Sequence, residues 1–273
     1  MVRIETCGAF VHVTLAAPAT RNALSDAMVA GLLEAIALAE ASPTVRALVI
    51  RGDGGTFCAG GDFGRFRELI AAPAPRDAPD PIAVFNRAFG ALLERLQGCA
   101  VATVAVVEGA AMGGGVGLAA ACDFVLAADS AQFGMPEVTL GLPPAQIAPF
   151  VAQRIGSGAA RRLMLTGRRI GTAQALALGL ADEALAPHAL DARLASLLGE
   201  LGRAEPAALR ATKVILKQRA EAPLATTLDA AAQLFATSLR SGTAGEGLAA
   251  FAAKRAAAWV VAPDDGAARE PPR

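Results

Sequence analysis

Two glycine-rich turns in this sequence could do chemistry through their backbone groups. The first lies in VAVVEGAAMGGGVGL (104–118), where an apolar run meets Gly113, Gly114 and Gly115 and then continues as a second apolar run. We interpret it as a buried strand, a tight turn and the start of a helix, because glycines leave the unpaired N–H groups of a helix start open to approach. The helix dipole adds about half a positive charge there. The stretch predicts an anion or oxyanion site, although a glycine turn without a ligand fits the same pattern.

The second turn is FCAGGD (57–62), which also follows an apolar strand pattern. An enolate or tetrahedral oxyanion is held best by two N–H groups, each about 2.7–3.1 Å from the oxygen. Two such turns in one chain therefore favour an oxyanion hole. Cys58 could be proposed as a nucleophile, but its neighbours are apolar and no histidine is near in sequence, so we expect a buried, unreactive thiol.

Glu137 is the strongest candidate for proton transfer. It lies in AQFGMPEVTLGLPP (131–144), where glycines and prolines indicate an irregular backbone and the surroundings are apolar. Such surroundings disfavour the charged carboxylate and tune its pKa towards neutral pH, as a general acid or base requires. An exposed loop glutamate is the alternative interpretation.

Composition excludes several classes of function. The 273 residues carry 25 basic and 25 acidic side chains, so neither a nucleic-acid surface nor an acidic tail is indicated. The four cysteines form no CxxC pair, and the two histidines are too few for a histidine-rich metal site. The N-terminus lacks a signal-type apolar core, and Glu108 and Asp123 interrupt the longest apolar runs. We expect a cytoplasmic protein without a metal or other cofactor, whose partners are small molecules or copies of itself.

The elements that must position these residues alternate between strands and helices. Strands are predicted at 9–15, 47–50, 101–107 and 123–127. Helices are predicted from Ser25 to Ser42 and at 63–71, 82–97, 158–165, 172–178, 188–201, 206–219, 224–239 and 246–259. The proline-rich segment 73–81 is expected to be a surface loop, either a lid or an unconstrained connection, and residues 263–273 are expected to be disordered. The recurring strand, turn and helix predict an α/β fold.

Several motifs together resemble the enoyl-CoA hydratase/isomerase (crotonase) superfamily. They are RNALS (21–25), FCAGGD (57–62), VEGAAMGGGVGLA (107–119), CDFVLAA (122–128), AQFGMPEVTLGL (131–142) and LTGRRI (165–170). Their order and spacing match over about residues 5–260. The resemblance implies a crotonase (ClpP-like) spiral of ββα units over residues 1–197, a C-terminal helical trimerisation region over 198–262 and a tail over 263–273. It also implies acyl-CoA thioester substrates and a homotrimer or dimer of trimers.

The resemblance assigns roles to particular residues. The N–H groups of Gly61 and Gly114 would hold the thioester oxygen, and Glu137 would transfer protons. Residues implied to contact the CoA or acyl group are Arg21, Ala23, Ala59, Gly60, Asp62, Gly113, Gly117, Pro136 and Leu140. Lys254 and Arg255 would reach a CoA phosphate of a neighbouring subunit.

The sequence departs from the best-known hydratases at one position. Those enzymes carry one glutamate in a GGGxE segment and another in the xPE segment, whereas this chain has Gly117 at the first position and keeps Glu137 at the second. One carboxylate must then transfer all protons, or share them with an unidentified group, and the missing side chain would open space for a branched acyl group. NRAFGALLE (86–94), GGGVGLA (113–119) and PAQIAPFVAQRIG (144–156) look most like isohexenylglutaconyl-CoA hydratases, with methylglutaconyl-CoA hydratases close behind.

The resemblance leaves three activities open. The leading prediction is hydration of a 2-enoyl-CoA with a branched glutaconyl-type acyl group. The alternatives are a Δ3-Δ2 enoyl-CoA isomerase, in which Glu137 shuttles one proton, and a non-catalytic binding protein with the same fold.

Overall fold

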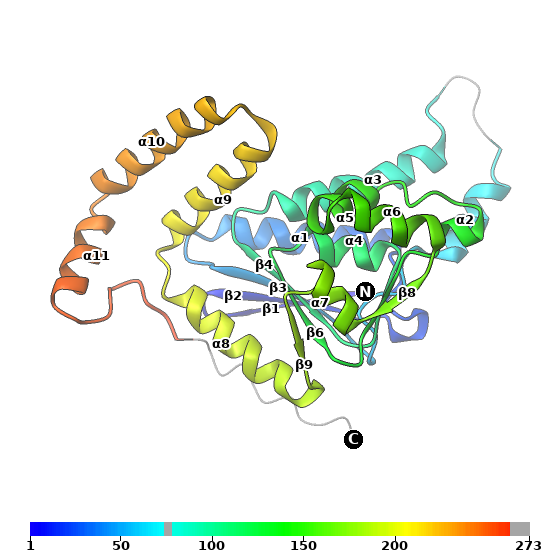
Figure 1. The fold of residues 1–273 in the computed structure, drawn as a ribbon, viewed down its shortest axis with the longest axis horizontal. Coiled ribbons are helices and arrows are strands. Elements are labelled where there is room, and N and C mark those ends of the chain that lie inside the picture. Colours follow the sequence, from blue (N-terminus) through cyan, green and yellow to red (C-terminus); the bar gives the residue numbers. More distant parts are fainter. Residues whose placement is uncertain (74–77, 263–273) are drawn as a thin grey trace.

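The computed structural model describes residues 1–73 and 78–262. Within these residues, six strands form one sheet in the order β1-β2-β3-β4-β6-β9 and three short strands form a second in the order β5-β7-β8 (Figure 1). The larger sheet consists of β1 (Val2–Cys7), β2 (Phe10–Leu15), β3 (Ala47–Gly52), β4 (Ala102–Val107), β6 (Phe124–Ala128) and β9 (Glu183–Leu185). The smaller consists of β5 (Ala110–Met112), β7 (Gln132–Gly134) and β8 (Arg169–Gly171).

The larger sheet is parallel except at its first pair. β1 and β2 are antiparallel, and β2, β3, β4, β6 and β9 then pair in parallel. Every residue of β4 is buried, as expected for a central parallel strand covered on both faces. Because parallel strands end at the same edge, the connections after β3 and β4 leave the sheet side by side. The first leads into FCAGGD, and the second passes through β5 before it reaches the glycines at 113–115.

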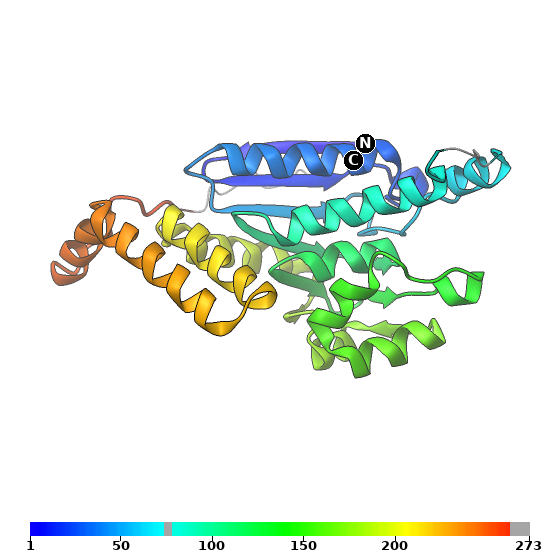
Figure 2. The same ribbon diagram turned by 90° about the horizontal axis from the view of Figure 1, so that it is seen from above.

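Layers of helix cover the strands in chain order. The helices of this part are α1 (Asp26–Ala41), α2 (Phe63–Ala71), α3 (Pro81–Gln97), α4 (Gly114–Ala121), α5 (Ala148–Ile155), α6 (Ser157–Thr166) and α7 (Thr172–Leu178), with short 3-10 helices η1 (Pro18–Thr20), η2 (Glu137–Leu140) and η3 (Pro187–Ala189). Helix α3 packs between α1 and α4, and α5 packs between α4 and α6. Figure 2 shows these units stacked from α1 downwards, which is the spiral expected of the fold.

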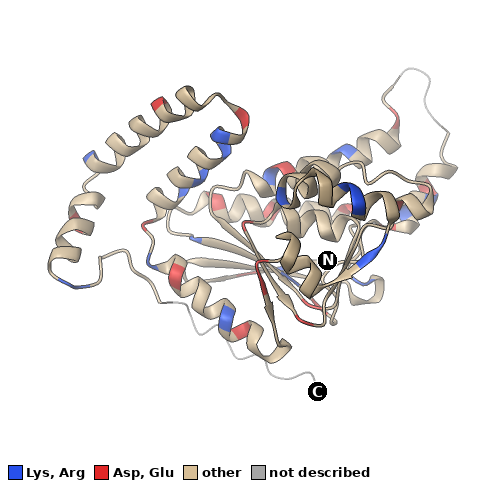
Figure 3. Cartoon of the chain, in the orientation of Figure 1, with Lys and Arg blue, Asp and Glu red and all other residues tan. Residues whose placement is uncertain are grey.

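The C-terminal helices α9 (Pro206–Glu221), α10 (Leu224–Arg240) and α11 (Thr243–Ala252) form an arm that extends away from the sheets (Figures 1 and 2). Helix α8 (Leu190–Gly202) packs on β6 and links the arm to the core. Lys213 Nζ donates to Val101 O at 2.9 Å, and Arg210 Nη2 donates to Ser42 O at 2.6 Å. The arm exposes many large apolar side chains, namely Val214, Leu216, Leu224, Leu228, Phe235, Leu239, Leu248 and Phe251. Acidic and basic side chains are interspersed over the core and the arm (Figure 3).

Most predicted elements are confirmed. The helices predicted at 63–71 and 172–178 have the observed bounds, and Ser25 caps α1 by accepting from Met28 N at 3.3 Å. The helix predicted over 246–259 is wrong beyond Ala252, where the chain turns so that Trp259 Nε1 donates to Arg203 O at 3.0 Å. Helix α8 runs across the predicted boundary at 197/198. Part of the predicted loop at 73–81 and the whole predicted tail at 263–273 lie outside the described residues.

Candidate active site

Backbone hydrogen bonds join the two glycine-rich turns. Cys58 N donates to Ala110 O at 3.0 Å, and Met112 N donates back to Cys58 O at 2.9 Å. Gly60 has a φ of +93°, and a Cβ built on it would lie 2.8 Å from Met112 O and 3.4 Å from Gly114 N. Glycine is therefore required at position 60 for the turns to approach this closely. The structure brings FCAGGD and the 113–115 glycines together, as the oxyanion-hole prediction requires.

Each turn presents an N–H group without a partner. Among residues 1–73 and 78–262, neither the Gly61 N–H nor the Gly114 N–H has a hydrogen-bond acceptor. Gly114 is the first residue of α4, where a helix leaves its N–H groups unpaired. The preceding Gly113 has a φ of +50° and donates its own N–H to Gly134 O at 2.8 Å, which fixes the helix start. The two turns therefore leave two donors on separate segments without acceptors, as an oxyanion hole would require.

Glu137 lies directly beside these donors. Its Oε1 is 2.8 Å from the position that a Cβ on Gly113 would occupy. Its Oε2 is buried and has no hydrogen-bond partner in the described part of the chain. Burial raises the pKa of this carboxyl above its usual value. The interpretation of Glu137 as an exposed loop glutamate is therefore wrong, and its environment is that of a general acid or base.

Gly117 does not open space in the site, and that expectation is wrong. A Cβ at this position would lie 2.5 Å from Ile147 Cγ2 and 3.3 Å from Leu93 Cδ1. Helix α4 is buried throughout, and the side chain of Ile147 packs where the second glutamate of the best-known hydratases would begin. The volume released by the glycine is thus occupied by aliphatic carbon.

The other predicted site residues lie around the 57–62 turn, around Glu137, or at the end of the arm. Arg21 and Ala23 border the 57–62 turn, since Ala59 N donates to Arg21 O at 2.9 Å and Leu24 N donates to Gly60 O at 2.8 Å. Asp62 accepts from Gly64 N at 2.9 Å and caps α2.

Pro136 precedes Glu137, and Leu140, three residues after Glu137 at the end of η2, has an exposed side chain. Lys254 and Arg255 follow α11 in the chain, and α11 lies at the end of the arm, far from α4 (Figure 1). Arg255 donates to Glu246 at 2.7 and 2.8 Å.

Asn22 supports the site and was not identified from the sequence. Its fully buried amide donates to Asp53 O at 2.9 Å and to Thr56 O at 2.7 Å, and it accepts from Ala17 N at 2.9 Å. These bonds fasten the loop that leads into FCAGGD. The available signal was the asparagine within RNALS (21–25), because asparagine tolerates the left-handed conformation that the structure shows here, with a φ of +57°.

The walls of the site are apolar and partly aromatic. The Phe66 ring reaches to 2.5 Å from the position of a Cβ on Gly61, and the Phe89 ring to 3.2 Å from that on Gly114. Phe66 stacks edge-to-face on both Phe63 and Phe85, each at 5.9 Å between ring centroids. A mostly hydrocarbon acyl group suits such walls.

Cys58 is not equipped to be a nucleophile. Its thiol is fully buried, and that burial raises its pKa to about 12. The Sγ atom accepts from Gly60 N at 3.4 Å. The expectation of a structural thiol is supported.

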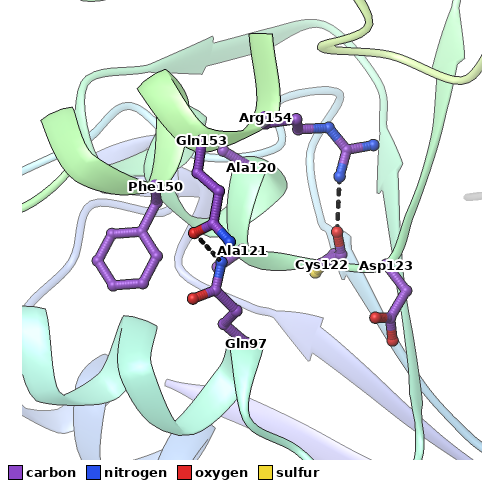
Figure 4. A pocket seen from close by; sticks show the side chains of 8 residues that line it. All are labelled: Gln97, Ala120, Ala121, Cys122, Asp123, Phe150, Gln153 and Arg154. Carbon is purple, nitrogen blue, oxygen red and sulfur yellow. Dashed lines mark hydrogen bonds between the residues drawn. The ribbon is translucent and has the colours of Figure 1, made fainter. Parts of the chain in front are cut away.

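A separate cavity of about 190 Å³ lies at the other end of α4 (Figure 4). Arg154 there donates to Cys122 O at 2.6 Å and to Asp182 Oδ2 at 2.8 Å, and Gln97 Nε2 donates to Gln153 Oε1 at 3.1 Å. These bonds connect structural elements. Of the other lining residues, Cys122 has a pKa raised to about 12 by burial, and Asp123 accepts from Thr103 and Lys213. Among the described residues, no three His, Cys, Asp or Glu side chains lie close enough to hold a metal ion together.

Comparison with known proteins identifies the class. The family model "Enoyl-CoA hydratase/isomerase" matches residues 5–261. The chain belongs to this family, and the crotonase-type fold is confirmed.

Individual relatives and solved structures are consistent with this family assignment. The chain is 33% identical to a putative enoyl-CoA hydratase of Thermus thermophilus, over 93% of this chain and 98% of the relative. It is also 33% identical to the 2,3-dehydroadipyl-CoA hydratase of Escherichia coli, over 89% and 91%. Among solved structures, Pseudomonas aeruginosa AtuE matches with a TM-score of 0.91 and 43% identity, over 95% of this chain and 99% of that one. An enoyl-CoA hydratase/isomerase from Marinobacter aquaeolei matches with a TM-score of 0.92 and 39% identity, over the same shares.

Proposed function

We propose that this protein is an enoyl-CoA hydratase that adds water to a branched glutaconyl-type 2-enoyl-CoA, such as isohexenylglutaconyl-CoA. One observation carries the proposal: a buried carboxylate with an unpartnered oxygen, Glu137, lies beside two backbone donors on separate turns. Hydrating an enoyl thioester requires these two parts, an oxyanion site and a proton-transfer group.

The reaction follows from the roles of the groups. The Gly61 and Gly114 N–H groups polarise the thioester C=O, which makes C3 electrophilic. Glu137 takes a proton from water as the oxygen bonds to C3, and the C2–C3 π electrons move to the thioester oxygen as an enolate. Protonated Glu137 then gives its proton to C2, and the enolate collapses to the C=O. Water is consumed, and the carboxylate is regenerated.

The substrate class rests on the surroundings of Glu137. Ile147 and Leu93 fill the region beside Gly117, so the wall there offers hydrocarbon in place of a second carboxylate. One relative is named for 2,3-dehydroadipyl-CoA, whose acyl group is a diacid. The motifs at 86–94, 113–119 and 144–156 support the isohexenylglutaconyl subtype.

The remaining features of the proposal concern binding and assembly. Arg21, Ala23, Ala59, Gly60, Asp62, Gly113, Gly117, Pro136 and Leu140 line the acyl-CoA path, and Lys254 and Arg255 contact the CoA of a neighbouring subunit. The enzyme is a homotrimer or dimer of trimers, and the exposed apolar side chains of the arm support self-association. It works in the cytoplasm without a cofactor. In the described residues, every helix is too short or too polar to cross a membrane.

The second candidate is a Δ3-Δ2 enoyl-CoA isomerase. It is favoured by the same lone carboxylate, since moving a double bond needs only one group to carry a proton from C2 to C4. A non-catalytic binding protein is the third and is disfavoured by the intact Gly61, Gly114 and Glu137.

A panel of four thioesters tests the proposal: crotonyl-CoA, methylglutaconyl-CoA, isohexenylglutaconyl-CoA and a 3-enoyl-CoA. Hydration and isomerisation are followed separately by absorbance and product chromatography. We expect hydration to be concentrated on the two glutaconyl compounds. Comparable efficiency on crotonyl-CoA would refute the substrate class, isomerisation alone would favour the second candidate, and tight binding without turnover would favour the third.

A further inference from the structure

Asn86 and Gln146 form a hydrogen-bonded amide pair between α3 and the segment before α5. Gln146 Nε2 donates to Asn86 Oδ1 at 2.8 Å, and both side chains are half-buried. The Gln146 amide lies flat on Gly90: a Cβ there would collide with its Oε1 and lie 2.8 Å from its Cδ. The missing side chain at position 90 makes room for this amide.

The pair adjoins the acyl side of the site. Leu93, Phe89 and Asn86 follow one another at spacings of three and four residues, so they share one face of α3. Leu93 packs beside Gly117 and Phe89 beside Gly114, so Asn86 continues the same wall by one more turn. Gln146 directly precedes Ile147, the residue that covers Gly117.

A cation lies next to the pair. Arg87 Nη1 is 3.2 Å from the Cβ position of Gly90, and Arg87 Nη2 donates to Glu94 at 2.9 and 3.0 Å. The hydrogen bond from Gln146 to Asn86 uses one N–H of the Gln146 amide, and each primary amide carries two N–H groups. The cluster Asn86, Arg87 and Gln146 therefore retains amide N–H donors and a guanidinium of which Nη2 is engaged in the ion pair with Glu94.

We propose that this cluster binds the free carboxylate of a diacid acyl-CoA and so selects glutaconyl-type substrates. The inference rests on the proposed function. A glutaconyl group is a five-carbon diacid, so after one carboxyl forms the thioester the other remains as an anion. Amide and guanidinium donors suit a carboxylate, and hydrogen bonds to a charged group are stronger than neutral ones. Asn86 and Gln146 are then specificity residues and have no part in proton transfer.

The test compares binding of two saturated thioesters, glutaryl-CoA and pentanoyl-CoA, which differ only in a terminal carboxylate against a methyl group. Dissociation constants are measured by calorimetry for the full-length protein and for Asn86→Ala and Gln146→Ala. We expect the wild type to prefer glutaryl-CoA and each variant to lose about 10- to 100-fold of that preference. Affinity for pentanoyl-CoA should change less than about twofold.

Gln153→Ala is the matched control, because Gln153 forms the other amide link between α3 and α5, with Gln97. It should leave the preference intact. The inference is overturned if the wild type favours pentanoyl-CoA, or if the Asn86 and Gln146 variants keep the wild-type preference. If the variants bound glutaryl-CoA and pentanoyl-CoA more weakly by the same factor, the Asn86–Gln146 pair would be a structural link only, and the inference would be refuted. Binding is measured without turnover, so the two hypotheses can fail separately. If the wild type prefers glutaryl-CoA and the variants lose that preference, but the enzyme hydrates none of the thioesters, the proposed function is refuted and this inference stands.

Discussion

Replacing Glu137 by glutamine removes the proposed proton carrier while keeping its shape. General acid–base catalysis contributes about 10²–10⁴-fold to a rate. Because one carboxylate serves both as base for water and as acid at C2, we expect a loss near the upper limit, about 10⁴-fold in kcat. At about 1.4 kcal/mol per factor of ten, this loss is about 5.5 kcal/mol of transition-state stabilisation.

The same substitution should stabilise the fold. Glu137 Oε2 is buried without a partner, and burial raises the pKa of the carboxyl, so the folded state holds its proton more tightly than the unfolded state does. Stability that depends on this group is therefore lost as pH rises from the ordinary glutamate pKa through the folded one. Glu137→Gln should unfold at a higher temperature than the wild type at pH 7, with the difference shrinking below about pH 4, near the ordinary glutamate pKa.

Two assays check this reasoning together. Hydration of the preferred thioester is followed across pH, and we expect kcat/KM of the wild type to fall on the acid side through a pKa above the ordinary glutamate value. Thermal unfolding of both proteins is recorded at pH 7 and pH 4. A loss in kcat below about tenfold would refute the role of Glu137 as sole acid and base. A variant less stable than the wild type at pH 7 would refute the destabilising effect of burying the unpartnered carboxylate.

Four further predictions address the surrounding structure. Gly114→Pro should lower kcat about 10²–10³-fold relative to Gly114→Ala, since both add a Cβ but only proline removes the N–H donor; equal rates would exclude this donor. Gly117→Glu should lower the free energy of unfolding by about 1–3 kcal/mol in chemical denaturation, because its Cβ meets Ile147, and adding Ile147→Ala should recover part of that loss; full stability in the single variant would contradict the packing. Asn22→Ala should cost about 3 kcal/mol in the same measurement, about 1 kcal/mol for each of its three hydrogen bonds, and an unchanged denaturation midpoint would show that the loop holds without them. Cys58 should resist iodoacetamide in the native protein and react after denaturation, as mass spectrometry of peptides will report; rapid native labelling would contradict its burial.

The oxyanion turns could be found from the sequence because their signal is local. Three adjacent glycines after an apolar run indicate exposed N–H groups wherever the chain later packs. The apolar setting of Glu137 likewise predicted a raised pKa, and the structure agrees. Local composition was sufficient in both cases.

Features that depend on residues far apart in the sequence could not be predicted from local sequence patterns. The space at Gly117 is filled by Ile147, thirty positions further along the chain, and no local pattern indicates where that side chain points. The role of Asn22 depends on carbonyl groups of residues 53 and 56. Strands β5, β7 and β8 have three residues each, too few for an alternating pattern to be recognised.

Prolines also misled the prediction around α5. Pro143 and Pro144 indicated an irregular backbone, and the next helix was predicted only at 158–165. Helix α5 nevertheless begins at Ala148, and Pro149 occupies its first turn, where a missing N–H costs nothing. The helix was missed because proline marks the start of a helix as readily as a loop.

The donors at Gly61 and Gly114 belong to the main chain, and this fact limits how the protein can diverge. A side-chain substitution that preserves the path of the backbone leaves both donors in place, so the proposed capacity to polarise a thioester would persist through most sequence drift. Under the proposed function, changes of activity then arise at the side chains around the acyl group, such as positions 86, 137 and 146. If the backbone donors are kept while the side chains around them change, one family can contain both hydratases and isomerases, as the family name says.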